Sequence, residues 1–417
     1  MNNKQLFERA YSRLTELYAS DYTTPDVVAL SRFYSEKKIL GESDLYMRYL
    51  DFLGKVRAKA EQRGEHIFVR GTAGSSFISF LLGATDINPL PRHEYCPNCH
   101  KVNFVGKGVP LDKPHIKCSC GTEIEVDGYN IPFESNLKSV LSEYVQLSVS
   151  YAFFDEVKAS IYNEFWDKSI VALKNEEDSI TWFCILDKET NEPGQYMLNG
   201  NSEIFSRYPR ITLVKDKTLD KYCELEKDTG FKMKDIGQDE ISYVYFQLME
   251  GKTQGIPFFE NKFIKEILKT VKVQSYDDLL KVIGFAHSSN VWKENAEYSY
   301  KEHIVSLSEI PAYREELYSI ICDRLNSKGI CDDGLAYEIM EKARRGYYAK
   351  TGEVDEDTAL SLLQIDFDID FIFFLEKINY MFPKAHGVAY LREVIAMMYY
   401  KLKYSKAYNA IMLENSG

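Results

Sequence analysis

Four of the eight cysteines form two close pairs that could bind a metal ion. The first pair is Cys96 and Cys99 in "CPNC", and the second is Cys118 and Cys120 in "CSCG". Four thiolates close a tetrahedral zinc site with no open position, so such a site is structural and not catalytic. Two close pairs, the second followed by glycine, favour zinc over four free cysteines in a loop. We therefore expect structural zinc as the cofactor.

Three aspartates alternate with apolar residues in "QIDFDIDFIFF", which runs from Gln364 to Phe374. On a strand, Asp366, Asp368 and Asp370 would share one face, as carboxylates do in sites that bind paired metal ions for phosphoryl transfer. On a helix, Asp366 and Asp370 share a face and Asp368 points elsewhere. The pattern by itself leaves both the helix and the metal-binding strand open.

A glycine-containing loop, "VRGTAGSS", combines groups that suit a phosphate. A strand delivers Arg70 into a turn with Gly71 and Gly74, and Ser75 and Ser76 then stand at a helix N-terminus. Free N–H groups, hydroxyls and a guanidinium together favour an anion. The loop lacks the G-K-[ST] of a Walker A motif. Taken alone, the favoured alternative is a serine that caps a helix after a glycine turn.

Two further segments place histidine and lysine at helix ends. In "FPKAH", Pro383 begins a helix and Lys384 and His386 lie in its first turn, where a lysine opposes the helix dipole unless an anion is present. The alternative is a solvated lysine and a surface histidine. In "GFAHSSNVW", His287 lies in a loop between helices, and the alternative is a capped helix end followed by a core tryptophan, Trp292.

Periodicity predicts the elements that must position these residues. Residues 3–63 have the apolar spacing of two or three helices, and "HIFVR" and "VQLSVSY" are typical of short strands. One long helix, "FFDEVKASIYNEFWDKSIVAL", is followed by the strands "ITWFCIL", "QYML" and "RITLV". The fold class is α/β (α+β). The expected parts are a helical segment at 1–65, an α/β domain at 66–235 with a zinc-binding insert at about 93–128, and a helical domain at 236–417.

Composition limits the classes of function. The chain has 417 residues, of which 45% are apolar and 27% charged, as in ordinary globular proteins. Its net charge of −12 argues against strong nonspecific binding of nucleic acid, although a local basic groove stays compatible with it. The start is polar and no apolar run reaches membrane-spanning length, so we expect a cytoplasmic protein without membrane contact.

Several motifs in the same order resemble a known family. The chain contains "VRGTAGSS", "DINPLPRHEYCPNCH", "NIPFES", "FAHSSNVW" and "YMFPKAHGVAY". This series resembles the PolC type of bacterial C-family replicative DNA polymerase over about residues 45–410. The likeness implies a polymerase palm with a zinc-ribbon insert and a helical fingers domain. The second cysteine pair departs from the family's C-x2-C, having lost one residue.

The resemblance also assigns roles to single residues. It implies that Arg70, Gly71, Ser75 and Ser76 belong to the palm loop that faces the incoming nucleotide. It implies that His287, Lys384 and His386 lie on the fingers. It also implies that "QIDFDIDFIFF" lies in a fingers helix, so we interpret this run as the solvated face of a helix and keep the metal-binding strand as the minority alternative. By the same resemblance, the positions of the family's three metal-binding aspartates are Gln146, Ser148 and Thr212. Because these side chains carry no negative charge, we expect no catalytic magnesium pair and no enzyme activity.

The expectation that follows is a PolC-like pseudo-polymerase that serves as a regulator, decoy or sensor. Its expected partners are primer–template DNA, a dNTP, or a replisome or phage replication protein, and its setting a mobile element or a defence system. One alternative is a protein-interaction scaffold that binds no nucleic acid. The other is an active nucleotidyl transferase that uses relocated carboxylates, such as Asp155, Glu156, Asp366 and Asp368.

Overall fold

The structure is a computed structural model of the chain. It describes residues 2–20, 24–105, 116–133, 144–174, 179–186, 194–197, 210–233, 236 and 238–412. The chain divides into two compact units. The first unit comprises Met1–Gly108, His115–Asp235 and Tyr404–Gly417, and the second comprises Val109–Pro114 and Ile236–Lys403.

Three helices open the first unit, as the apolar spacing predicts. They are α1 (Asn3–Tyr18), α2 (Val27–Leu40) and α3 (Asp44–Arg63). Each begins after a polar side chain that accepts a hydrogen bond from a backbone N–H of the first turn, namely Asn2, Asp26 and Ser43. Their apolar faces are buried in one core that continues onto a β-sheet.

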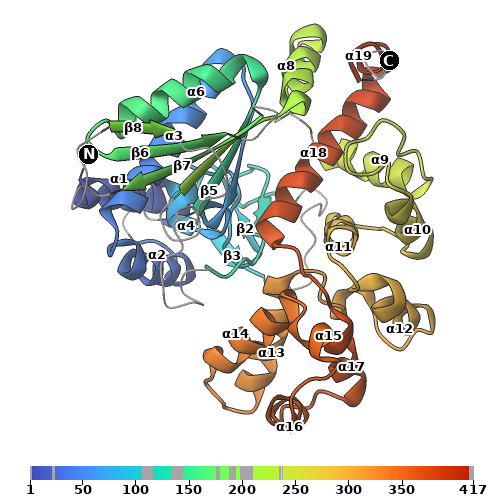
Figure 1. Ribbon diagram of the computed structural model, residues 1–417. Helices are drawn as coiled ribbons and strands as arrows, with labels where there is room; N and C mark the ends of the chain where they lie inside the picture. Colours follow the sequence, from blue (N-terminus) through green and yellow to red (C-terminus); the bar gives the residue numbers. More distant parts are fainter. Residues whose placement is uncertain are drawn as a thin grey trace. The chain divides into compact units, whose positions relative to one another are not determined.

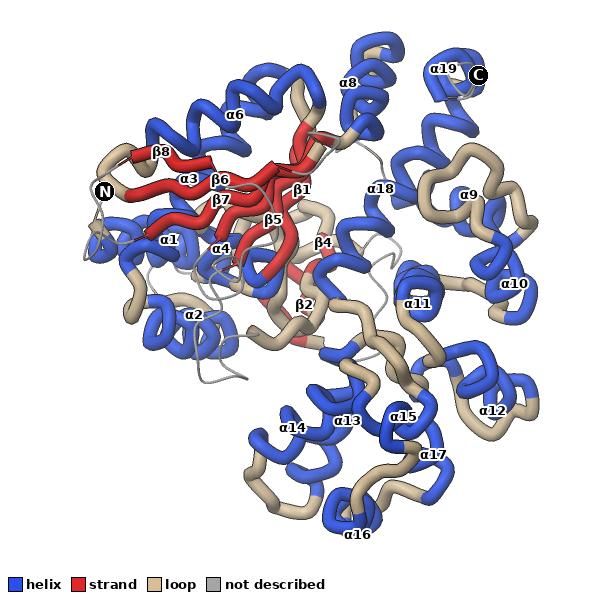
Figure 2. The backbone as a smooth tube through the Cα atoms, in the orientation of Figure 1, coloured by secondary structure: helices blue, strands red, loops and turns tan. Residues whose placement is uncertain are grey.

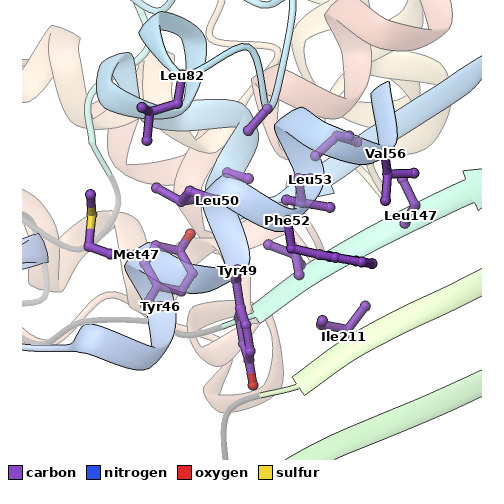
Figure 3. Packing of buried hydrophobic residues seen from close by; sticks show 14 of the residues in the cluster. Tyr46, Met47, Tyr49, Leu50, Phe52, Leu53, Val56, Leu82, Leu147 and Ile211 are labelled. Carbon is purple, nitrogen blue, oxygen red and sulfur yellow. The ribbon is translucent and has the colours of Figure 1, made fainter. Parts of the chain in front are cut away.

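The central sheet of the first unit has six strands in the order β1-β5-β9-β7-β6-β8 (Figures 1 and 2). The strands are β1 (Ile67–Gly71), β5 (Tyr144–Val149), β6 (Ser169–Lys174), β7 (Ile180–Leu186), β8 (Gly194–Met197) and β9 (Arg210–Lys215). The β5–β9 and β6–β8 pairs are parallel and the others antiparallel. One face packs on helices: Leu53 and Val56 of α3 lie against Leu147 and Ile211 of the sheet (Figure 3).

The predicted long helix of the first unit is too long. Helix α6 (Tyr151–Glu164) ends before Phe165, and the following "SIVALK" forms strand β6. Strand β6 is held by β7 on one side and by β8 on the other, so pairing with distant strands decides its conformation. Its apolar residues fit helical spacing and strand alternation equally, because short apolar runs do not separate the two.

The cysteine-containing insert is a small three-stranded sheet of its own. Strands β2 (His93–Tyr95), β3 (Val102–Phe104) and β4 (Glu125–Asp127) pair in the order β3-β2-β4. A buried polar network ties this sheet to α1, because Asn88 donates to both the Tyr18 hydroxyl at 2.8 Å and Asp127 at 2.6 Å. Elements η1 (Thr72–Ser75), α4 (Phe77–Leu81), α8 (Lys217–Thr229) and α19 (Ser405–Met412) complete the first unit.

Helices, joined by loops and turns, are the secondary-structure elements of the second unit in its described residues. Its main helices are α9 (Gln238–Met249), α10 (Lys262–Thr270), α11 (Tyr276–His287), α12 (Glu297–Lys301), α13 (Arg314–Ser327), α14 (Asp333–Arg344), α15 (Tyr347–Thr351), α16 (Glu356–Gln364), α17 (Ile369–Lys377) and α18 (Lys384–Lys403). The short turns η3 (Trp292–Ala296) and η4 (Leu307–Glu309) link them. The predicted α/β (α+β) fold with a helical second part is confirmed. Within the described ranges, no helix is both long and apolar enough to cross a membrane.

The aspartate run is neither a strand nor a single helix, so the helical prediction is wrong for its first half. Helix α16 ends at Gln364, and Asp366 adopts a left-handed conformation with φ of 63° in the turn that follows. Asp368 is the N-cap of α17 and accepts from the N–H of Phe371 at 2.9 Å. Asp366 pairs with Lys328 at 2.7 Å. Two of the three carboxylates therefore have structural partners of their own, and α17 begins only at Ile369.

Candidate functional site

The three positions assigned to metal-binding aspartates lie together at the centre of the six-stranded sheet. Arg70 of β1 is opposite Gln146 of β5, and Gln146 is opposite Thr212 of β9. Residues opposite one another on paired strands point to the same face, and Ser148 is two residues along β5, so it shares that face. This is the face opposite Leu147 and Ile211, which are in the core. The sheet therefore places four polar side chains in one row.

Two of these side chains are buried without a hydrogen-bond partner among the described residues. They are the hydroxyls of Ser148 and Thr212, which are 1% and 5% exposed. A buried hydroxyl without a partner costs roughly 1–3 kcal/mol, so such atoms are uncommon in folded proteins. The row thus has hydrogen-bonding capacity that the described chain does not use.

Relocated carboxylates do not gather elsewhere in the described residues. Asp155 is exposed on α6, and Glu156 pairs with Lys59 at 2.5 Å and also with Arg63. In those same ranges the four cysteines form the one group of three or more potential metal ligands. Of these candidate carboxylates, Glu156 and Asp366 form ion pairs, Asp368 caps a helix, and Asp155 is exposed.

The loop from Arg70 to Ser76 is bound by an internal carboxylate. Glu36 of α2 is fully buried and accepts from the N–H of Phe77 at 2.9 Å, from the N–H of Ile78 at 3.1 Å and from the Ser76 hydroxyl at 2.7 Å. These are the donors that a phosphate would use at the N-terminus of α4. Ser76 is the N-cap of α4 and accepts from the N–H of Ser79, as the alternative interpretation predicts, and a glutamate of the same chain accepts from the helix start.

Arg32 completes this arrangement. Its guanidinium pairs with Glu36 and donates to the carbonyl oxygens of Ser75 at 2.8 Å and Ile131 at 3.0 Å. A buried carboxylate is stable only when it is paired and hydrogen-bonded, and Glu36 meets both conditions. The Arg32–Glu36 pair, which sequence patterns did not single out, fixes the backbone of the loop behind Arg70.

The helix start at Lys384 has internal anions as well. The backbone N–H of Lys384 donates to Glu315 at 2.9 Å, and its ammonium lies 3.3 Å from Glu316. Lys281 of α11 contacts the other oxygen of Glu316 at 3.0 Å. Burial by itself would raise the pKa of Glu316, but the two ammonium groups lower it to about 2. Glu316 thus resolves the conflict between Lys384 and the helix dipole.

His287 and His386 belong to a group of rings in the second unit that contact one another in stacked, tilted and edge-on arrangements. We call this group the ring cluster, and it comprises Phe258, His287, Phe382, His386 and Tyr390. His287 stacks on Phe382 with ring centres 5.0 Å apart, and Phe258 stacks on Tyr390 at 4.2 Å. All five rings are partly exposed. The cluster presents ring surface beside Lys384, which is two residues from Phe382 and from His386 in the chain.

Tyr313 holds the two helices of the ring cluster together. Its ring is fully buried and its hydroxyl donates to the carbonyl of Leu280 at 2.5 Å. A Cβ at Gly284 of α11 would lie 2.8 Å from this ring, and a Cβ at Gly387 of α18 would clash with it. Both helices therefore need glycine where they meet Tyr313. The glycine of "AHGVAY" is the signal that could have revealed this close approach.

The four cysteines of the insert come together as a metal centre requires. Their Sγ atoms all lie within 4.8 Å of one another, with 3.5 Å between Cys96 and Cys120 and between Cys99 and Cys118. Tetrahedral zinc with Zn–S bonds of about 2.3 Å needs sulfur atoms about 3.8 Å apart, so the geometry fits. Hydrogen bonds from Thr122 lower the pKa of Cys120 to about 5, which favours the thiolate that binds metal.

Comparison with known proteins identifies relatives over most of the chain. Residues 213–327 match the family model for the bacterial DNA polymerase III alpha subunit finger domain. The chain is 25% identical to the DNA polymerase III PolC-type of Caldanaerobacter subterraneus subsp. tengcongensis over 432 residues, which cover 85% of this chain and 30% of that protein. It is 26% identical to the Clostridium perfringens protein of the same name, in an alignment that covers 85% of this chain and 29% of that protein. It is 23% identical to the Streptococcus thermophilus protein of that name, in an alignment that covers 96% of this chain and 32% of that protein.

The comparisons correct one expectation. The absence of carboxylates at Gln146, Ser148 and Thr212 led us to expect that the chain is not an enzyme, whereas the relatives are named for an enzyme, a DNA polymerase. The chain spans about 30% of the length of these relatives. The finger-domain match and the alignments over 85–96% of the chain lead to one conclusion. This protein is a relative of PolC-type DNA polymerase III that corresponds to about a third of that enzyme.

Proposed function

We propose that this chain binds primer–template DNA together with an incoming deoxynucleoside triphosphate, as a PolC-related component of DNA replication. The observation that carries the proposal is the ring cluster beside Lys384, in the helical unit whose first part matches the finger-domain model. Every base has a π-face, so partly exposed rings bind bases without regard to sequence.

The charge around the ring cluster favours a phosphate group. Arg314, Lys281 and Lys384 supply three cations, and Glu315 and Glu316 supply two carboxylates, so this group has a net charge of about +1. A triphosphate can share the two lysines with Glu316 because ammonium groups offer three donors each. The negative net charge of the whole chain does not oppose such a local site.

In the α/β unit, considered by itself, we assign contact with a phosphate of the primer–template to Arg70. The neighbouring Ser76 is engaged by Glu36, and Ser75 is held through its carbonyl by Arg32. Gly71 and Gly74 allow the backbone to approach a ligand. Arg70 lies in register with Gln146, at the row of polar side chains on the sheet.

The test is fluorescence anisotropy of a labelled primer–template titrated with the full chain in Mg²⁺, with and without the next complementary dNTP. We expect saturable binding that tightens with the dNTP. Tyr390→Ala should remove the tightening, whereas Tyr298→Ala, which changes an exposed tyrosine outside the ring cluster, should not. Equal tightening in the two variants would contradict the assignment. Primer extension in the same mixture reports nucleotidyl transfer, the activity for which the relatives are named.

A further inference from the structure

A cavity of about 570 Å³ opens between the first two helices of the chain. It is lined by four aromatic rings of α1 and α2, together with two lysines, a glutamate and a serine. The rings are Phe7, Tyr11, Phe33 and Tyr34. None of these residues takes part in the sheet, the zinc centre or the ring cluster, so the cavity is separate from the sites described above.

The rings that line the cavity differ in how far they are exposed to solvent. Phe7 and Phe33 are buried at 7% and 1% exposure, whereas Tyr34 is 52% exposed at the rim. Tyr11 packs edge-on against Phe33 at 5.6 Å, and Phe33 packs edge-on against Tyr34 at 5.4 Å. The contacts hold the rings in place, so a planar ligand meets a preformed surface instead of ordering one.

One lysine of the cavity, Lys37, lies next to two of these rings and has no carboxylate partner among the described residues. The ammonium of Lys37 lies 5.4 Å from the ring centre of Phe7 and 5.8 Å from that of Tyr34. Among the described residues no carboxylate lies within ion-pair distance of it. Lys4, also in the lining, lies 3.9 Å from the exposed Glu8, which is its one ion-pair partner among the described residues. An exposed ion pair of this kind is worth little, so Lys4 can turn to another anion at small cost.

We infer that this cavity, which we call the α1–α2 groove, binds single-stranded nucleic acid. Aromatic rings next to ammonium groups suit an unpaired strand, because bases stack on the rings and phosphates pair with the cations. A base would stack on Tyr34, and the flanking phosphates would contact Lys37 and Lys4. The inference goes beyond the proposed function and does not rest on it, since it needs neither a duplex nor a triphosphate.

The experiment is anisotropy of fluorescein-labelled oligo(dT), without duplex or dNTP, titrated with the full chain at several salt concentrations. Two phosphate contacts predict a slope of log affinity against log salt of about −1.4. Tyr34→Ala should weaken binding between about 5-fold and about 150-fold, the range that corresponds to loss of one stacked base. Lys37→Gln should reduce the slope by about 0.7. Oligo(U) should bind like oligo(dT), because neither rings nor lysines read the 2′-hydroxyl.

Two further variants test the groove: one should leave the affinity for oligo(dT) unchanged, and the other should increase it. Tyr347 is 50% exposed and has Lys342 at 5.8 Å from its ring centre, but that lysine pairs with Glu338 at 2.8 Å and with Asp355 at 3.4 Å. Tyr347→Ala should leave oligo(dT) binding unchanged. Glu8→Gln removes a carboxylate from the lining of the groove and should tighten binding. The inference is overturned if the wild-type chain shows no saturable binding of oligo(dT), or if Tyr34→Ala and Tyr347→Ala have the same effect.

The two tests fail independently. Loss of dNTP-dependent binding to primer–template with oligo(dT) binding retained would overturn the proposed function alone. The reverse result would overturn only the α1–α2 groove. Each groove variant changes an exposed side chain, so folding is checked by the melting temperature and is expected to match the wild type.

Discussion

Gly387 of α18 lies directly against the buried ring of Tyr313, close enough that any Cβ at this position would overlap the tyrosine hydroxyl and ring. Gly284 of α11 approaches the same ring, with a hypothetical Cβ 2.8 Å from its Cζ atom. Tyr313 therefore sets the spacing of the two helices that carry His287 and His386. The geometry of the ring cluster depends on a tyrosine outside it.

Gly387→Ala should therefore destabilise the second unit. The added methyl must displace a fully buried ring, and overpacking of this kind costs about 1–3 kcal/mol. Urea unfolding measures the change in free energy. Gly334→Ala is the control, because a Cβ there meets only the flexible Asp332 side chain at 3.3 Å. Gly334→Ala should leave the free energy of unfolding unchanged or raise it by up to about 1 kcal/mol. Equal effects at the two glycines would contradict the role of Tyr313.

Glu36 should be essential for the loop that carries Arg70. Glu36→Gln leaves the half-buried Arg32 without its charge partner and replaces one acceptor oxygen of a fully buried side chain by a donor facing N–H groups. Breaking a buried ion pair costs about 3–5 kcal/mol, so the free energy of unfolding should fall by that order. Glu16→Gln is the matched control, since it removes an exposed pair with Arg13 and should change stability by less than about 1 kcal/mol. A small loss for Glu36→Gln would show that the pair does not anchor the loop.

Stability should depend on pH through Glu316. Its folded-state pKa of about 2 lies below the value of about 4.3 for an unperturbed glutamate. The stabilisation is therefore present above about pH 4.3 and is lost as the pH falls toward 2. Glu316→Gln should lower stability at neutral pH by a few kcal/mol and flatten the dependence in this range. Melting temperatures measured from pH 7 to pH 3 test this dependence of stability on pH. Glu302→Gln is the control, because Glu302 is exposed, and its melting temperature should vary with pH as that of the wild type does.

The four-cysteine cluster should bind one zinc ion and stabilise the insert. Elemental analysis of the purified chain should find zinc, and Cys96→Ser should remove it because a three-thiolate site is incomplete. Zinc binding contributes directly to folding free energy, so a chelator should lower the melting temperature. Cys331→Ser is the control, since this exposed cysteine lies outside the cluster. Zinc retained in full by Cys96→Ser would contradict a four-thiolate centre.

Features specified by short local patterns were predictable from the sequence. The cysteine pairs, three initial helices, their polar caps and the helical character of the second unit all depend on residues within a few positions of one another. Strand β6 was missed because its conformation depends on pairing with β7 and β8. The aspartate run was misassigned because Asp366 leaves the helix through a left-handed turn, which alternation of residue types does not signal.

The sequence by itself indicated that the helix starts at Ser76 and at Lys384 favour an anion, because free N–H groups and the helix dipole are local properties, and it left a capping serine and a solvated lysine as the alternatives. Only the tertiary structure decided which anion is there. Glu36 is 40 residues from Ser76 in the chain, and Glu315 is 69 residues from Lys384, yet folding brings each carboxylate into hydrogen-bond contact. A helix N-terminus does not distinguish a phosphate from a carboxylate, so its occupant depends on which distant residue the packing of the core delivers to it.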